Sequence, residues 1–138
     1  MDEMVGGYFT IESNILGLDT RAIEKLLGFR WGRLDQGARV LVLSRQPAPG
    51  EFSSRGSTRV PDGQGLNHAR IDATQAIPGA WWNRRLVKVQ PRRPHTPEEV
   101  YPPARGIAAE QWVLRPGVRI LARLVQELSS GDVYRGRA

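Results

Sequence analysis

The sequence predicts a small α+β fold, in which a mixed or antiparallel sheet of five to six short strands packs with one or two helices. Three observations favour this class. One segment carries both a start and a stop signal for a helix, several short apolar runs are bounded by proline or glycine, and no regular alternation of strands with long helices is visible. At 138 residues the chain has the length of one domain, so we expect a single domain over residues 1–138.

The first expected elements are a short strand and the clearest helix. Residues 8–11, Tyr-Phe-Thr-Ile, are β-compatible. Asp19 can accept a hydrogen bond from a free backbone amide at the start of a helix over residues 20–27, and Gly28 suits the left-handed conformation that ends one. We expect Trp31, in the loop that follows, to cover this helix as part of the core.

Two strands are expected in the middle of the chain. Residues 40–43 form the apolar run Val-Leu-Val-Leu, which is typical of a central strand buried on both faces. Residues 81–90 indicate a strand with a basic start, which Pro91 ends. Between these two strands, residues 52–60 suit another strand and residues 64–77 allow a short helix.

The longest apolar stretch runs over residues 110–128. Pro116 and Gly117 suit the central positions of a type II turn, which would fold residues 111–114 back on residues 118–125 as a hairpin. The second arm fits a strand with period two and a helix with period 3.6. Its β-branched residues favour the strand, with Ile120 and Ala122 facing inward.

Two further segments complete the chain. Residues 91–105 contain five prolines, and we expect a proline-rich loop that is longer than most connections in compact domains. Such loops are often functional, and this one would suit a docking arm for a larger complex. Residues 132–135 could form a last edge strand.

The charge of the chain suggests an anionic partner. The formal net charge is +6, and all basic residues are arginines except Lys25 and Lys88. Guanidinium groups bind phosphate and carboxylate groups bidentately, so RNA or an acidic protein would be a suitable macromolecular target. A genome of high GC content would produce the same arginine excess without a functional cause. The chain has no cysteine, which excludes disulfides and thiol nucleophiles.

The sequence contains no targeting or membrane signal that we recognise. Its first residues lack a basic region followed by an apolar run, and no apolar stretch approaches the roughly 20 residues of a membrane span. We expect a cytoplasmic protein, or one delivered into a target cell without a classical signal peptide, and no membrane partner.

Aromatic and basic side chains are interleaved around residues 81–93. They are Trp81, Trp82, Arg84, Arg85, Lys88, Arg92 and Arg93. Single-stranded nucleic acid is held by this combination of stacking rings and phosphate-binding guanidinium groups. His95, close to these arginines, could act as the general base that cleaves a ribose-phosphate chain. The alternative is a buried tryptophan pair beside a solvated basic face. His68 and His95 lack the spacing of metal ligands, so no metal site is expected.

Residues 110–119, Glu-Gln-Trp-Val-Leu-Arg-Pro-Gly-Val-Arg, resemble the late segment of ADP-ribosyltransferase-type bacterial toxins. In that family a glutamate-bearing loop leads into a strand, a Pro-Gly turn and a further strand. The resemblance implies that NAD is the substrate and that Glu110 polarises its ribose hydroxyl. It also implies that Arg45 holds the NAD phosphate, while Ser57 and Thr58 support the site as catalytic and cofactor-binding residues. Gln111 stands where the family usually has a second glutamate.

Three functions stay open at this point. The first is transfer of ADP-ribose from NAD to a macromolecular target by a small toxin-like effector, which would be accompanied by an antitoxin or immunity partner. The second is RNA binding or cleavage. The third is a non-catalytic assembly or adaptor module of a larger protein complex. We favour the first, because it uses an ordered set of residues along the chain and not composition alone.

Overall fold

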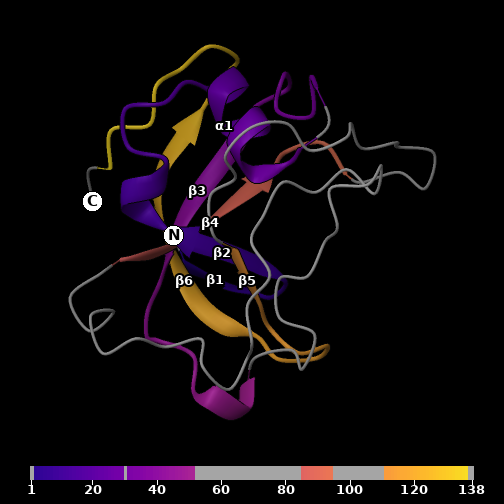
Figure 1. The fold of residues 1–138 in the computed structure, drawn as a ribbon, viewed down its shortest axis with the longest axis vertical. Coiled ribbons are helices and arrows are strands. Elements are labelled where there is room, and N and C mark those ends of the chain that lie inside the picture. The colour runs from indigo at the N-terminus through magenta and orange to yellow at the C-terminus, as the bar shows by residue number, and fades with distance from the viewer. Residues whose placement is uncertain (1, 30, 52–84, 95–110, 137–138) are drawn as a thin grey trace.

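The structure, a computed structural model, describes residues 2–29, 31–51, 85–94 and 111–136. In these ranges it contains one α-helix, two short 3-10 helices and six strands (Figure 1). The elements are β1 (Asp2–Val5), β2 (Tyr8–Ile11), η1 (Glu12–Asn14), α1 (Thr20–Leu27), β3 (Ala38–Leu43), η2 (Pro49–Glu51), β4 (Leu86–Pro91), β5 (Gln111–Val113) and β6 (Ile120–Leu128). Every strand pairing is antiparallel, so the predicted α+β class is confirmed.

The six strands form one curled sheet. Their order is β1-β6-β3-β4-β2-β5, and with antiparallel neighbours throughout, β1 and β2 run in the same direction. Only Gly6 and Gly7 separate β1 from β2, although three strands lie between them in the sheet. Residues 114–119 likewise join β5, at one end of the order, to β6 near the other. These two short connections require the sheet to curl, as Figure 1 shows for the long β6.

Strand β3 lies between β6 and β4 and is buried on both faces, as its uninterrupted apolar run predicts. Val40 faces α1 and belongs to a cluster that we call the helix-side core. Its buried members are Ile15, Ile23, Leu27, Leu34, Ala38, Val40, Val87, Val89, Leu128 and Tyr134. Leu41 faces the other side and belongs to the second core, whose buried members are Val5, Phe9, Leu41, Leu43, Leu86, Trp112, Leu114, Ile120 and Ala122.

Helix α1 has the predicted bounds and the predicted caps. The side chain of Asp19 accepts a hydrogen bond of 2.8 Å from the backbone amide of Ala22, and Gly28 adopts a φ of 74°. Ile23 and Leu27 face the sheet and are buried. The prediction succeeded because caps depend on residues that are close in sequence.

Glu24 is a buried carboxylate on α1 that organises the loop after the helix. Its oxygens accept hydrogen bonds from the backbone amides of Gly32, at 3.0 Å, and Leu34, at 2.8 Å. Arg21 pairs with the same carboxylate at 3.0 Å. These partners compensate the cost of burying the charge, and they direct Leu34 into the helix-side core.

The turn at Pro116 is confirmed, but the predicted hairpin is wrong. The amide of Val118 donates to the carbonyl of Arg115 at 3.0 Å, and Gly117 has a φ of 85°, as a type II turn requires. The flanking strands do not pair with each other, because β5 pairs with β2 while β6 lies between β1 and β3. Long-range pairing therefore overrides the local turn.

The segment after the turn, which fits both a strand and a helix by sequence, forms the strand β6. Ile120 and Ala122 are buried in β6, whereas Leu121 and Arg123 between and after them are exposed. The register against β3 shifts between Val40 and Leu41, where an irregularity in the pairing allows the end of β6 to face the helix-side core. This shift explains why one period does not describe the whole segment.

Other expectations are corrected or lie outside the described ranges. Trp31 does not cover the core, because its side chain is 69% exposed and packs under the Arg21 guanidinium, 4.0 Å from the ring centroid. Residues 132–135 form no strand, since Val133 makes a single bridge to Asp19. The expected strand at 52–60, the helix at 64–77 and most of the loop at 91–105 fall outside the described residues.

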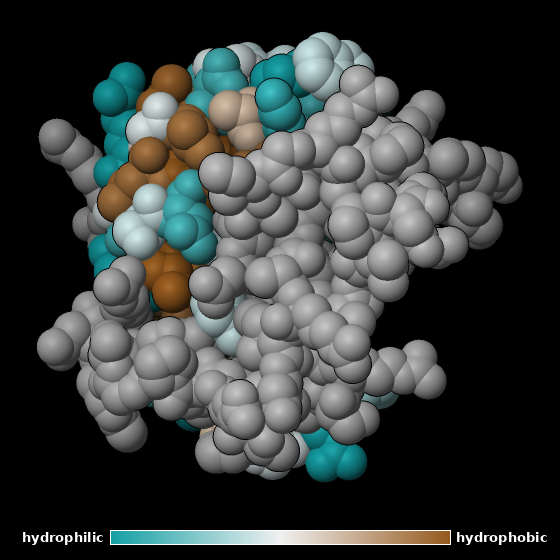
Figure 2. Space-filling model, viewed as in Figure 1, coloured by the Kyte–Doolittle hydropathy of each residue, from teal (hydrophilic) through white to brown (hydrophobic). Residues whose placement is uncertain are grey.

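The surface beside α1 is partly apolar. In Figure 2 apolar residues gather on the visible described surface near the segment between β2 and α1, which includes Leu16, 43% exposed. Tyr134 packs fully buried beneath this segment, and its hydroxyl donates a 2.6 Å hydrogen bond to the carboxylate of Glu12. Burial and this bond raise the pKa of Tyr134. In the described ranges no helix is long and apolar enough to cross a membrane.

Candidate anion-binding site

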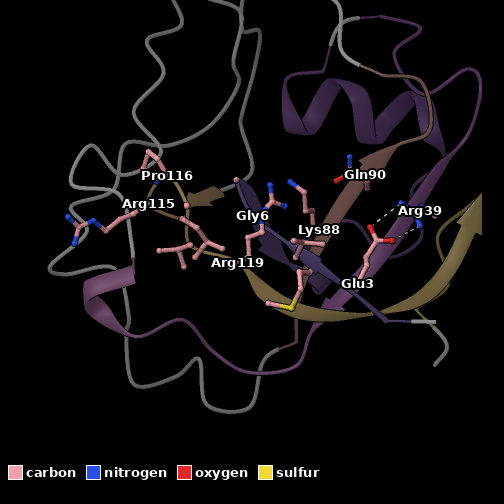
Figure 3. Close-up of a pocket in the computed structure, with 14 residues that line it drawn as sticks. Glu3, Gly6, Arg39, Lys88, Gln90, Arg115, Pro116 and Arg119 are labelled. Atoms are coloured by element: carbon pink, nitrogen blue, oxygen red, sulfur yellow. Dashed lines mark hydrogen bonds and ion pairs between the residues drawn. The ribbon is translucent and has the colours of Figure 1, made fainter.

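A pocket of about 590 Å³ opens where the two short connections interrupt the curled sheet (Figure 3). One wall is the end of β1 with Gly6 and Gly7, another is the turn at residues 114–119, and the floor is formed by β3 and β4. The lining residues are Glu3, Met4, Val5, Gly6, Gly7, Arg39, Lys88, Gln90, Leu114, Arg115, Pro116, Gly117, Val118 and Arg119. Four of the five charged residues in this set are basic, so the pocket favours anions.

Among the described residues that line the pocket, Glu3 is the one carboxylate, and it is already neutralised. Glu3 on β1 accepts two hydrogen bonds from the Arg39 guanidinium on β3, at 2.6 and 3.0 Å. Such a bidentate pair fixes both side chains at one side of the pocket, as the dashed lines in Figure 3 show. Lys88 and the two arginines of the 114–119 turn are therefore left to determine the charge of the pocket.

Lys88 extends from β4 on the same face as Leu86 and Gln90, because side chains alternate along a strand. Its ammonium donates to the backbone carbonyl of Tyr8 at 3.1 Å. Burial, together with the nearby positive charge of Arg119, lowers the pKa of Lys88 to about 8. The fold thus places a cation in a position where it is unfavourable, which is typical of functional sites.

Arg119 lies opposite Lys88, at the end of the 114–119 turn. Figure 3 shows both side chains extending toward the same region beside Gly6. Within the part of the chain that the structure describes, Arg119 makes no side-chain hydrogen bond and no ion pair. Its guanidinium and the Lys88 ammonium are therefore two neighbouring donors that no described carboxylate neutralises.

The Gly6–Gly7 connection allows the close approach of the pocket walls. A Cβ atom at Gly6 would lie 3.1 Å from the backbone oxygen of Val118, and one at Gly7 would lie 3.4 Å from the Lys88 ammonium. Gly7 also has a φ of 72°, which other residues rarely adopt. Larger side chains here would press on the wall and on Lys88.

Arg115 has a structural role at the rim. Its backbone amide donates to the carbonyl of Glu51 at 2.8 Å, and its guanidinium donates to the carbonyl of Gly50 at 3.1 Å. These bonds attach the 114–119 turn to η2, and Figure 3 shows the side chain directed away from Lys88. Arg115 therefore positions the turn that carries Arg119.

The structure places only one of the residues implied by the toxin resemblance. Arg45 donates two hydrogen bonds to Glu51, at 2.6 and 2.8 Å, and is exposed. The Arg45 bonds, with a bond from the Ala48 amide, lower the pKa of Glu51 to about 2. The Arg45 guanidinium is therefore occupied by its ion pair with Glu51 in the same loop. Glu110, Ser57 and Thr58 lie outside the described residues.

The structure describes only part of the aromatic and basic segment around residues 81–95 that was predicted to bind nucleic acid. Arg85 lies 3.6 Å from the Glu12 carboxylate, and Arg92 pairs with Glu127 at 3.0 Å. Arg85 precedes β4 and Arg92 follows it, so about 20 Å of strand separates them. The Arg93 carbonyl accepts a hydrogen bond from Arg33. Trp81, Trp82, Arg84 and His95 lie outside the described residues.

Sequence reasoning did not identify the pocket, although one signal was present. Lys88 is the only charged residue in the run Leu-Val-Lys-Val of β4, and such a residue must face either solvent or a polar site inside the fold. Arg119 directly precedes Ile120, which was expected to face inward, so the alternation of a strand predicted that Arg119 faces outward. Arg39 and Glu3 gave no signal, because β1 and β3 are brought together only through their shared pairing with β6.

No family model, characterised protein or solved structure matches this chain. We therefore infer the function from the residues of the pocket.

Proposed function

We propose that this protein binds a phosphate-bearing small molecule, of the nucleotide class, in the pocket between β1, β4 and the 114–119 turn. The observation that carries the proposal is the pair of adjacent cations, Lys88 and Arg119, in a pocket where the only carboxylate among the described lining residues is held by Arg39. Two neighbouring cations repel each other and reduce stability, and an anion of charge near −2 would relieve this repulsion.

The dimensions and donors of the pocket support the same ligand class. Its volume of about 590 Å³ lies within the range of small-molecule sites, roughly 300–1,000 Å³. A guanidinium can bind two phosphate oxygens at once, and an ammonium adds a point charge beside it. Apolar lining from Val5, Leu114 and Val118 would contact the rest of the ligand.

Calorimetric titration tests this proposal with ADP as the probe. We expect wild type to bind ADP but not adenosine. Its affinity for ADP should fall as the salt concentration is raised. Arg119→Ala should weaken ADP binding roughly 10- to 100-fold, because a charge-assisted bond contributes about 1.5–3 kcal/mol. Arg123→Ala is the matched control, since Arg123 is an exposed arginine four positions along the same segment.

Two results would contradict the proposal. One is the absence of ADP binding to folded wild type. The other is equal loss of affinity in Arg119→Ala and Arg123→Ala, which would mean that only the net charge of the chain matters.

NAD is a second candidate ligand, with ADP-ribosyl transfer as its chemistry. Residues 114–119, which line the pocket, belong to the stretch that resembles the toxin family, and that stretch has the order of strand, Pro-Gly turn and strand. In this proposal Arg119 and Lys88 hold the NAD pyrophosphate in place of Arg45, and Glu110 supplies the carboxylate that polarises the ribose.

Release of nicotinamide from NAD tests this second candidate. Wild type should hydrolyse NAD or modify a target protein, and Glu110→Gln should reduce the rate at least ~100-fold, since a carboxylate that acts in the transition state would be lost. Glu127→Gln, an exposed glutamate that pairs with Arg92, should keep full activity. If wild type binds ADP but releases no nicotinamide, NAD chemistry is rejected while phosphate binding stands.

A further inference from the structure

Lys88 has the surroundings of a reactive amine. Its only hydrogen bond to a described residue is the one to the Tyr8 carbonyl, and the pocket carboxylate that could pair with it is held by Arg39 at 2.6 and 3.0 Å. An amine with a pKa of about 8 is neutral in about one molecule in ten at pH 7, roughly a few hundred times the fraction of an ordinary lysine. Neutral amines are nucleophiles, and burial or a neighbouring cation is a common way to obtain them.

The geometry around the amine leaves room for a reacting carbon. Gly7 lines the pocket beside the ammonium, where a Cβ would already lie 3.4 Å away. Val5 and Leu114 add apolar atoms to the lining of the same pocket. Arg119, across from Lys88, could hold a phosphate while the other end of the same small molecule meets the amine (Figure 3).

We propose that Lys88 forms an imine with the carbonyl group of a phosphorylated aldehyde or ketone bound in this pocket. This inference rests on the proposed function, because it assigns the phosphate of the ligand to Arg119. The neutral amine adds to the carbonyl carbon, and the carbonyl oxygen takes up a proton. The proton that the oxygen takes up is one of the two amine hydrogens, and loss of the resulting hydroxyl with the second amine hydrogen, as one water molecule, leaves the C=N bond, so no oxidant or reductant is required.

Reductive trapping tests the imine, with pyridoxal 5′-phosphate as the probe because it carries both an aldehyde and a phosphate. Folded wild type is incubated with the probe near pH 7.5 and treated with borohydride, and the labelled peptides are quantified by mass spectrometry. The chain provides its own control, because Lys25 is the one other lysine and is exposed on α1. Lys88 is expected to be labelled at least ~10-fold faster than Lys25, despite its lower exposure.

Two further arms separate the imine from phosphate binding. Labelling of Lys88 by pyridoxal, which lacks the phosphate, should be several-fold slower, and excess ADP should protect Lys88 from the phosphorylated probe but leave Lys25 unchanged. Arg119→Ala should remove the advantage of the phosphorylated probe. If ADP binds in the calorimeter but Lys88 is labelled no faster than Lys25, the imine is rejected and the anion site stands. If Lys88 reacts equally fast with both probes and ADP gives no protection, the phosphate assignment fails.

Discussion

Replacing Glu24 with alanine is expected to lower the free energy of unfolding by about 2–4 kcal/mol. The reason is that the carboxylate is 1% exposed and accepts hydrogen bonds from the amides of Gly32 and Leu34 and from Arg21. Its removal leaves two backbone donors without acceptors and opens a cavity beneath the loop. Urea unfolding followed by circular dichroism measures the effect.

Two other variants define the mechanism at this position. Glu24→Gln keeps the size of the side chain but has one carbonyl oxygen, so we expect an intermediate loss of stability. Lys25→Ala changes the exposed neighbour on the same helix and should alter stability by less than about 0.5 kcal/mol. A loss in Glu24→Ala no larger than that in Lys25→Ala would show that the loop does not depend on this carboxylate.

Replacing Lys88 with methionine is expected to raise the free energy of unfolding by about 1–3 kcal/mol at pH 7. Burial and the charge of Arg119 lower the pKa of Lys88 from 10.5 to about 8 in the folded chain. Below pH 8 the amine is charged in both the folded and the unfolded chain, so the folded state carries the full cost of this half-buried charge. Methionine has a similar length and no charge, and it removes this cost.

The pH dependence of this gain follows from proton binding. Between about pH 8 and pH 10.5 the unfolded chain binds more protons at Lys88 than the folded chain, so wild-type stability rises with pH in this window. The advantage of Lys88→Met should therefore shrink from pH 8 to pH 10.5 and vanish above it. Urea unfolding at several pH values measures the difference, with Lys25→Met as the exposed control. A methionine variant that is less stable than wild type at pH 7 would contradict the buried charge.

The two substitutions together distinguish a structural from a functional buried charge. Glu24 has three donors directed at it and stabilises the loop, whereas Lys88 donates to one acceptor among the described residues and has a neighbouring like charge. Proteins usually retain a destabilising group where it takes part in binding or chemistry. The opposite signs of the two predicted changes in unfolding free energy therefore support a functional role for Lys88 in the pocket.

The features that sequence predicted well depend on short-range rules. Asp19 and Gly28 mark the ends of α1 through local hydrogen bonding and backbone conformation, and the apolar run of β3 indicated a central strand. The turn at Pro116 and Gly117 was also correct, since its φ preferences belong to the two residues themselves.

The features that sequence missed depend on pairings between distant segments. The hairpin prediction was wrong because β5 and β6 each pair with a strand near the N-terminus. Phe9 of β2 lies opposite Trp112 of β5, and Val5 of β1 lies opposite Ile120 of β6. The same long-range pairings assemble the pocket, which joins β1, β3, β4 and the 114–119 turn. A pattern search along the chain therefore could not bring Arg119 and Lys88 together, whereas the topology of the sheet does.

Titration of the ¹⁵N-labelled protein with ADP, followed by amide NMR spectra, tests the central claim most directly. The backbone amides of Gly6, Gly7 and Gly117 line the pocket, and all three are glycines whose signals are well separated in such spectra. We predict saturable shifts of these three amides, while Gly28 and Gly131, which do not line the pocket, stay unchanged. Shifts confined to residues outside the pocket, or none at saturating ADP, would contradict the account.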